Sequence, residues 1–344
     1  MALLSSDKND RKVQEAERVA TAASEAQVAE LDAQAAAAEA EGATSDAADA
    51  GGKKGKKDKD GKKRADSYWA VSWNIFKKNK LGMFCLGVVI FLVLVAIFAD
   101  VIAPYDPYET DLVNMLQSPS LEHPFGTDEY GRDILSRIIY GCRVSLSVGV
   151  VSQLIALVIG FLAGVCAGYF GGKVDSVISF VIQVFSSFPF LLFAIVLMFA
   201  LGAGLINLYL ALGLLMWTST ARLIRGDVMR LKNSEYIQSC ILSGGSAWRV
   251  IMKHLLPNCV STLIVTATLG IPSAIISESS LSFLGLGVQT PMASWGQMIS
   301  SAQSYILSST YYSVIPGIAI IITVMAFNLL GDALRDALDP KMRS

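Results

Sequence analysis

Residues 234–258 read SEYIQSCILSGGSAWRVIMKHLLPN, a polar, glycine-broken insert between two long apolar runs. Ser234 is a suitable N-cap, and apolar side chains recur after it at helical spacing. Gly244 and the glycine that follows it break this first helix. Ser246 is a suitable cap for a second helix, which we expect to end at Pro257 because proline disrupts helix continuation. The stretch therefore predicts two short helices that meet at an angle.

The composition of the whole chain is too apolar for a soluble domain. The sequence has 344 residues, a hydrophobic fraction of 53% and a mean hydropathy of +0.50, values that predict an integral membrane protein. The net charge is −1, and more than half of the lysines and arginines precede residue 81. We therefore interpret the positions of the basic residues as an indication of membrane topology and not of nucleic-acid binding. The cysteines form no paired motif and are predicted to be small buried residues rather than metal ligands or disulfides: Cys85, Cys142, Cys166, Cys240 and Cys259.

Six apolar stretches have about the length of 20 residues that a bilayer core about 30 Å thick requires. They cover residues 81–103, 144–169, 177–201, 205–223, 259–284 and 313–330. Lysine and arginine cluster before the first stretch, between the fourth and fifth, and after the sixth, so the positive-inside rule predicts cytoplasmic termini. The same rule places the loop over 225–258 in the cytoplasm and the loop over 104–143 outside.

The first 67 residues are rich in alanine and acidic side chains and then in lysine, and they contain too few apolar residues to form a core. We expect a disordered cytoplasmic tail without a signal peptide, so that the first apolar stretch acts as the insertion signal. Residues 68–80 combine tryptophans with a lysine-rich end, as an interfacial segment would. Residues 81–344 then form the six-span domain.

The spacing within residues 234–258 resembles the EAA loop of importer-type ABC permeases, which docks on the ATPase subunit. Three small or polar residues at 238–240 precede Gly244, and Leu256 and Pro257 follow twelve residues later. Gln-Ser-Cys stands where the family often has Glu-Ala-Ala, and His254 stands where isoleucine is common. The resemblance assigns coupling to Glu235, Gln238, Ser239, Cys240, Gly244, Ala247, Leu256 and Pro257.

Two further segments resemble the signatures of dipeptide and oligopeptide permeases. Residues 123–149 read HPFGTDEYGRDILSRIIYGCRVSLSVG, and residues 278–299 read ESSLSFLGLGVQTPMASWGQMI. Together with the loop, the resemblance covers the chain from Tyr68 to its end. It implies an all-α integral membrane protein with the type I ABC importer-like permease fold, multi-pass in the cytoplasmic or inner membrane.

The resemblance further implies a permease subunit that imports dipeptides or oligopeptides, with several partners. These are a second homologous permease subunit, two ATP-binding subunits and an external solute-binding protein. The sequence lacks a Gly-x-x-x-x-Gly-Lys-Ser/Thr phosphate loop, so we expect no ATPase activity from this chain. ATP and magnesium would belong to the partner subunits, and no cofactor would bind here directly. The two histidines, His123 and His254, fall in loops on opposite sides of the membrane and cannot share a metal ion.

Several residues inside the spans are candidates for packing or for the translocation pathway. Gly160, Gly164 and Gly168 recur every fourth residue, which favours close helix packing over substrate contact. Pro189 and Pro272 remove backbone hydrogen bonds at membrane depth, so we expect their spans to line the pathway.

Each polar residue near these two prolines has two alternative interpretations. Gln183 and Ser186, close to the first proline, are candidates for substrate contact, with bundle packing as the alternative. Glu278 is the acid within an apolar run, about 28 Å along the fifth span at about 1.5 Å per residue, near the outer boundary. A structural role near an external gate and a substrate contact are equal alternatives there.

Other functions remain open at this stage. A helix-glycine-helix hairpin with basic residues also describes a DNA-binding motif, but membrane spans adjoin both of its ends. A secondary transporter would favour ionisable groups near the bilayer midplane, where the sequence places none. A membrane scaffold, and a permease for nickel or another small solute, are the remaining alternatives.

Overall fold

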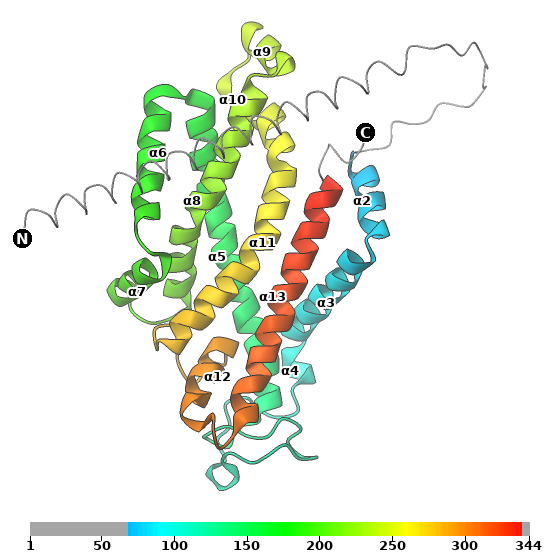
Figure 1. Cartoon of the computed structure of the whole chain (residues 1–344), viewed down its shortest axis with the longest axis vertical. Helices are drawn as coiled ribbons and strands as arrows, with labels where there is room; N and C mark the ends of the chain where they lie inside the picture. The colour runs from blue at the N-terminus through cyan, green and yellow to red at the C-terminus, as the bar shows by residue number, and fades with distance from the viewer. Residues whose placement is uncertain (1–67, 339–344) are drawn as a thin grey trace, which may run out of the picture. The chain divides into compact units, whose positions relative to one another are not determined.

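The computed structural model describes residues 68–338, and every regular element in that range is helical. The long helices α5 (Ile134–Phe170), α8 (Leu205–Lys232), α11 (Leu256–Phe283) and α13 (Thr310–Leu338) form the bundle in Figure 1. Helix α3 (Lys80–Ile97) packs on α13 and α5. The predicted all-helical membrane fold is confirmed, whereas the predicted disordered tail lies outside the described residues.

The closest helix packing in the bundle joins α5 to α8. A Cβ atom on Gly160 would lie 2.8 Å from the carbonyl oxygen of Trp217, and one on Gly164 would lie 2.7 Å from that of Ala221. A Cβ atom on Gly168 would lie 2.9 Å from the carbonyl oxygen of Arg225. Backbone cannot yield as a flexible side chain does, so these positions exclude any side chain larger than hydrogen.

The number and shape of the spans differ from the sequence expectation. Within the described range, α3, α5, residues 247–283 and α13 are each long and apolar enough to cross a membrane. The predicted third span is broken into α6 (Gly172–Ser187) and α7 (Phe190–Leu201), which meet at 92°. With this bent pair counted as one span, the total is five rather than six.

Two physical reasons explain these differences. Pro189 occupies the N-cap of α7 and separates two helices, because its ring fixes φ and disfavours a helical residue before it. Helix α8, the predicted fourth span, carries Asn207, Arg222 and a run of hydroxyl residues, and its packing against α5 replaces part of the contact with lipid. These polar residues lower its mean hydropathy, so length and composition alone do not mark it as a span.

The two ends of the bundle carry different structures (Figure 1). One end holds α9 (Glu235–Leu242) and α10 (Ala247–Val250), and the other holds α4 (Ala99–Ile102), η1 (Leu112–Asn114), α12 (Trp295–Ala302) and η3 (Gln303–Tyr305). The separate helix α2 (Tyr68–Lys78) packs its Phe76 against α13 and leaves Trp69 and Trp73 exposed.

A buried ionic cluster fixes the segment between α4 and α5. Helix α5 begins about ten residues before the predicted span because the Asp133 carboxylate caps it, accepting a hydrogen bond from the Ser136 N–H at 2.8 Å. The fully buried Arg137 donates to the carbonyl oxygen of Pro107 at 3.0 Å and to Gln297 of α12 at 3.1 Å. Its Nε also lies 3.3 Å from Asp128, so one guanidinium joins this segment to α5 and α12.

The α5–α8 contact predicts a strong position dependence for glycine substitution. Gly164→Val should lower the free energy of unfolding by about 1–3 kcal/mol or prevent accumulation, because overpacking against backbone forces the helices apart. Gly87→Val on α3 is the matched control, since a Cβ atom there meets nothing within 4 Å. Thermal unfolding of the two purified variants measures the difference, and equal midpoints would contradict the proposed role of the contact.

Candidate functional site

The Gly244 loop, residues 234–258, contains a well-formed helix stop. Helix α9 ends in a Schellman motif, in which the Gly244 N–H donates to the carbonyl oxygen of Ile241 and the Gly245 N–H donates to that of Cys240, both at 3.0 Å. Gly244 has a φ of +81°, the left-handed conformation that this motif requires at its glycine. The expected break between two helices is therefore present and has a defined geometry.

The two glycines have different roles. A Cβ atom on Gly244 would meet nothing within 4 Å, so its positive φ, and not a close approach, is what requires glycine. A Cβ atom on Gly245 would lie 2.7 Å from the carbonyl oxygen of Cys240. The two constraints that require glycine are therefore divided between neighbouring residues.

The second helix does not end at Pro257, contrary to the sequence prediction. After α10 the chain forms a π-helix, η2 (Ile251–Leu255), and continues into α11, with Pro257 in the first turn of that helix. The Leu256 N–H donates to the carbonyl oxygen of Ile251, five residues earlier. The chain therefore stays helical through the position, with Pro257 in the first turn of α11, where a missing N–H is tolerated.

The caps of the two short helices also differ. Ser246 caps α10 as predicted, its Oγ accepting a hydrogen bond from the Arg249 N–H at 3.4 Å. Ser234 occupies the N-cap position of α9, but its hydroxyl donates to the carbonyl oxygen of Leu231 and makes no cap. The contact holds α9 to the end of α8.

The Gly244 loop is anchored by an apolar floor. Ile237, Val250 and Leu255 are fully buried against Val165 of α5 and Ile224 of α8. Polar contacts add to this floor: Thr262 donates to Asp227 at 2.6 Å, which ties α11 to α8. The loop is therefore a rigid extension of the bundle rather than a free hairpin.

The outer rim of the loop consists of four exposed apolar side chains: Tyr236, Leu242, Trp248 and Met252. Leu242 is 85% exposed and Trp248 is 70% exposed. Such a cluster on a rigid lobe is typical of a surface that docks on another protein. Sequence reasoning missed these residues because it treated apolar side chains in helices as core, and the short helices have too few turns for periodicity to decide.

The residues assigned to coupling all lie in this loop, but with different exposure. Glu235, Gln238, Ser239, Gly244 and Pro257 are exposed, whereas Cys240, Ala247 and Leu256 are half-buried. The Gln238 side chain donates to the carbonyl oxygen of Lys232 at 3.3 Å, so part of its hydrogen-bonding capacity is used within the chain.

The pathway candidates separate into two groups. Gln183, Ser186 and Pro189 are exposed on α6 and at the break before α7. Pro272 and Glu278 are buried within the chain, so they do not line a surface of it. Of the two readings of Glu278, the geometry supports the structural one.

Glu278 joins α11 to the start of α12. Its carboxylate accepts hydrogen bonds from Ser282 at 2.7 Å and from Ser294 at 2.8 Å. Ser294 is the N-cap of α12 and also accepts from the Gln297 N–H at 3.1 Å. The acid therefore fixes α12 through its cap, an arrangement that no spacing rule predicts because Ser294 lies sixteen residues away.

Comparison with known proteins identifies the family. The model of the binding-protein-dependent transport system inner membrane component matches residues 156–344, and that of the N-terminal TM domain of oligopeptide transport permease C matches residues 67–119. The chain belongs to the first of these families. Its resemblance to permeases is thus confirmed, and it is an inner membrane component with several helices long enough to span the bilayer.

Relatives of this permease component extend over most of the chain. It is 43% identical to the dipeptide transport system permease protein DppC of Bacillus subtilis, covering 83% of this chain and 90% of the relative. It is 39% identical to the oligopeptide transport system permease protein OppC of the same organism, covering 82% and 92%. It is 42% identical to the glutathione transport system permease protein GsiD of Escherichia coli O6:K15:H31, covering 80% and 91%.

Among solved structures, this permease component resembles the MetNI methionine ABC transporter in an inward-facing conformation. The TM-score is 0.52 at 19% sequence identity, covering 60% of this chain and 98% of the other. At this identity the likeness concerns the fold alone.

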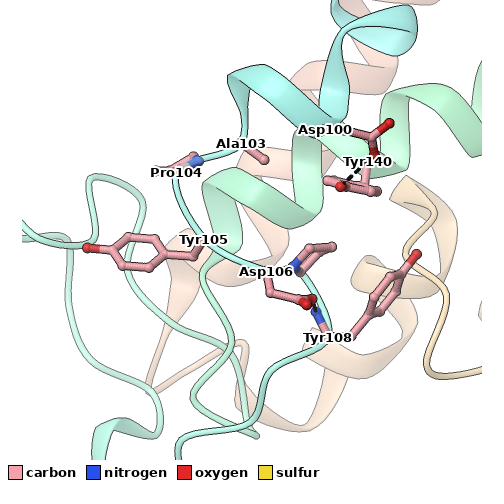
Figure 2. A pocket seen from close by; sticks show the side chains of 8 residues that line it. Asp100, Ala103, Pro104, Tyr105, Asp106, Tyr108 and Tyr140 are labelled. Atoms are coloured by element: carbon pink, nitrogen blue, oxygen red, sulfur yellow. Dashed lines mark hydrogen bonds between the residues drawn. The ribbon is translucent and has the colours of Figure 1, made fainter.

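A hollow of about 340 Å³ lies beside α4, at the end of the bundle away from α9 and α10 (Figure 1), and is shown from close by in Figure 2. Asp100 accepts hydrogen bonds there from Tyr140 at 2.7 Å and from Arg143 at 3.0 Å. The Arg143 hydrogen bond, followed by that of Tyr140, holds the pKa of Asp100 below its ordinary value. Asp106 accepts from the Tyr108 N–H at 2.8 Å. Both carboxylates are thus engaged by the chain itself, and the hollow supports no assignment.

The positive φ of Gly244 predicts a graded response to substitution. Gly244→Leu should loosen the end of α9, because a left-handed conformation costs a residue with a Cβ atom about 1–2 kcal/mol. Gly244→Asn is the matched control, since asparagine tolerates this conformation. Amide hydrogen exchange over residues 240–250 should rise about tenfold in the leucine variant only. An unchanged rate in that variant would show that the loop does not depend on its glycine.

Proposed function

We propose that this chain is a membrane-spanning permease subunit of an ABC importer for dipeptides or oligopeptides. The proposal is supported by membership of the inner membrane component family and by relatives named for dipeptide and oligopeptide transport. In this function the chain forms part of the pathway and the partner subunits hydrolyse ATP with magnesium. Its partners are a second homologous permease subunit, two ATP-binding subunits and an external solute-binding protein.

The observation that carries the proposal is the outer rim of the Gly244 loop. A docked ATP-binding subunit would bury Leu242 and Trp248, and burial of such side chains provides the central contacts of an interface. The loop is anchored on α5 and α8 and is continuous with α11, so a push on the rim moves these helices as a body. ATP-driven closure of the partner subunits would in this way alternate access to the pathway.

A second candidate substrate is glutathione. The relative named for glutathione transport is about as similar as those named for dipeptides and oligopeptides. Glutathione is itself a small peptide with free carboxylates, so the same pathway chemistry would serve both. Uptake measured with each class of substrate distinguishes them.

The function is tested by reconstitution of the complete importer into vesicles. We expect ATP-dependent uptake of a labelled dipeptide, and we expect Leu242→Ala together with Trp248→Ala to abolish it at matched membrane abundance. Loss of central contacts worth about 2 kcal/mol or more should weaken association with the ATP-binding subunit about thirtyfold or more.

Leu307→Ala is the matched control for the rim variant, because Leu307 is even more exposed than Leu242 but lies between η3 and α13, at the other end of the bundle. It should leave uptake and ATPase co-purification unchanged. Full ATPase binding by the rim double variant would refute the docking assignment, and absence of ATP-dependent peptide uptake by the wild-type importer would refute the substrate class.

The orientation of the chain is a separate proposal with its own test. Both termini and the Gly244 loop would be cytoplasmic, because basic residues concentrate on that side. Reporters fused after Arg64 and at Ser344 should behave as internal, and one inserted near Gln117 should behave as external. An external signal from the reporter at Ser344 would rule out this topology.

A further inference from the structure

Arg222 lies on the face of α8 toward α6 and, among the described residues, has no acidic partner. Five arginines lie within 4 Å of a carboxylate: Arg132, Arg137, Arg143, Arg225 and Arg230. Within residues 68–338 no carboxylate lies at ion-pair distance from Arg222. Its guanidinium instead donates one hydrogen bond to the Ser186 hydroxyl of α6, at 3.1 Å. Arg225, one turn further along α8, forms two bonds to Asp175 at 2.5 and 2.6 Å.

The contact with Ser186 places the charge of Arg222 toward the middle of α8 rather than toward its end, on the exposed side of the α6–α8 pair. Asp175 and Ser186 are eleven residues apart on α6, or about 16 Å at about 1.5 Å per residue. The neighbouring Phe185 ring lies 5.7 Å from the ring of Trp217, which is twelve residues after the start of α8 and fifteen before its end. The guanidinium therefore extends from its own turn of α8 back toward the middle of that helix.

A cation at this depth requires a polar environment. An unpaired arginine in a membrane-spanning bundle faces a water-filled cavity or another polar group, because exposure to lipid is costly. Arg222 and Ser186 are exposed on the isolated chain, as is Gln183 one turn earlier on α6. These three residues, together with the exposed Ser187 and Ser219, make this part of α6 and α8 polar, which points to the translocation pathway.

Arg222, Ser186 and Gln183 together have the chemistry of a carboxylate site. The guanidinium retains several N–H donors beyond the one that Ser186 accepts, and it matches a carboxylate in geometry and charge. The Ser186 hydroxyl keeps its own proton to donate, and the Gln183 amide adds donors of the same kind. All dipeptides and unmodified oligopeptides carry one terminal carboxylate, whatever their side chains.

We propose that Arg222, with Ser186 and Gln183, binds the terminal carboxylate of the peptide during its passage through the bundle. The proposal rests on the proposed function as a peptide importer and assigns to it a specificity site. Such a site would favour peptides with a free terminus while accepting variable side chains. The competing occupant is a carboxylate of the second permease subunit, in which case the arginine would have a structural role.

The decisive experiment compares two substrates in the reconstituted importer. Uptake is measured for a dipeptide and for its C-terminal amide, chosen so that the wild-type importer takes up both. Arg222→Gln should reduce uptake of the free acid about tenfold or more, because a hydrogen-bonded charge pair is lost, and should change uptake of the amide by no more than about twofold. Arg335→Gln is the matched control, since Arg335 is exposed at the end of α13 and also has no carboxylate at ion-pair distance in the described range.

The outcomes separate this inference from the proposed function. If Arg222→Gln slows both substrates equally, the arginine pairs with protein and the site is refuted, while peptide import stands. If the wild-type importer takes up no dipeptide and no dipeptide amide, the proposed function itself is refuted. Unchanged uptake of the free acid in the variant also overturns the site.

A second measurement tests the location without relying on transport. Arg222→Cys is placed in a chain whose half-buried cysteines, Cys166 and Cys240, are replaced by serine. In the assembled importer it should react with a water-soluble cationic thiosulfonate, and free dipeptide should slow the reaction more than the amide does. Phe91→Cys, exposed on the peripheral helix α3, is the control that should remain unlabelled in lipid. An unreactive Arg222→Cys would refute a water-filled location.

Discussion

The backbone contact between α5 and α8 is the constraint on which the other features depend. Because three successive turns of α5 each carry a glycine that faces α8, the two helices approach until a Cβ atom at any of these positions would meet the main chain of α8. This parallel pair brings Val165 beside Ile224 and Val228, the floor on which the Gly244 loop stands. The same pair positions Arg225 of α8 opposite Asp175 of α6, to which it donates hydrogen bonds. At the end of the pair, Lys232 of α8 donates a hydrogen bond at 2.7 Å to the carbonyl oxygen of Tyr169 of α5.

Part of this architecture follows from short-range rules and could be predicted. The apolar runs predict the long helices, the four-residue glycine repeat predicts a close contact face, and Gly244 after an apolar helix predicts the left-handed stop. The features that could not be predicted depend on contacts between distant residues. A proline in a helix can bend it, break it or be taken up by a π-turn, and Pro189 and Pro257 take different routes because their surroundings differ.

The sequence also does not show which side chains are exposed or how far a long side chain extends from its own turn of helix. Trp248 is apolar and helical, as a core residue would be, and only the packing of Val250 and Leu255 shows that it faces outward. Arg222 falls at the predicted end of a span, where a basic residue signals topology. The length of its side chain and the antiparallel course of α6 bring its charge to a depth that linear position does not indicate.

The unbroken helical course from Ala247 to Phe283 has a mechanical consequence. At about 1.5 Å per residue, these 37 residues form a rod about 55 Å long that joins the Gly244 loop to the Glu278 cluster. Neighbouring helices hold the rod just past its midpoint: the side chain of Gln153 of α5 packs on Gly270, and the side chain of Leu269 packs on Gly331 of α13. A helix held there connects the Gly244 loop to the Glu278 cluster, and Pro272, two residues beyond Gly270, makes the held point the place where this helix can bend.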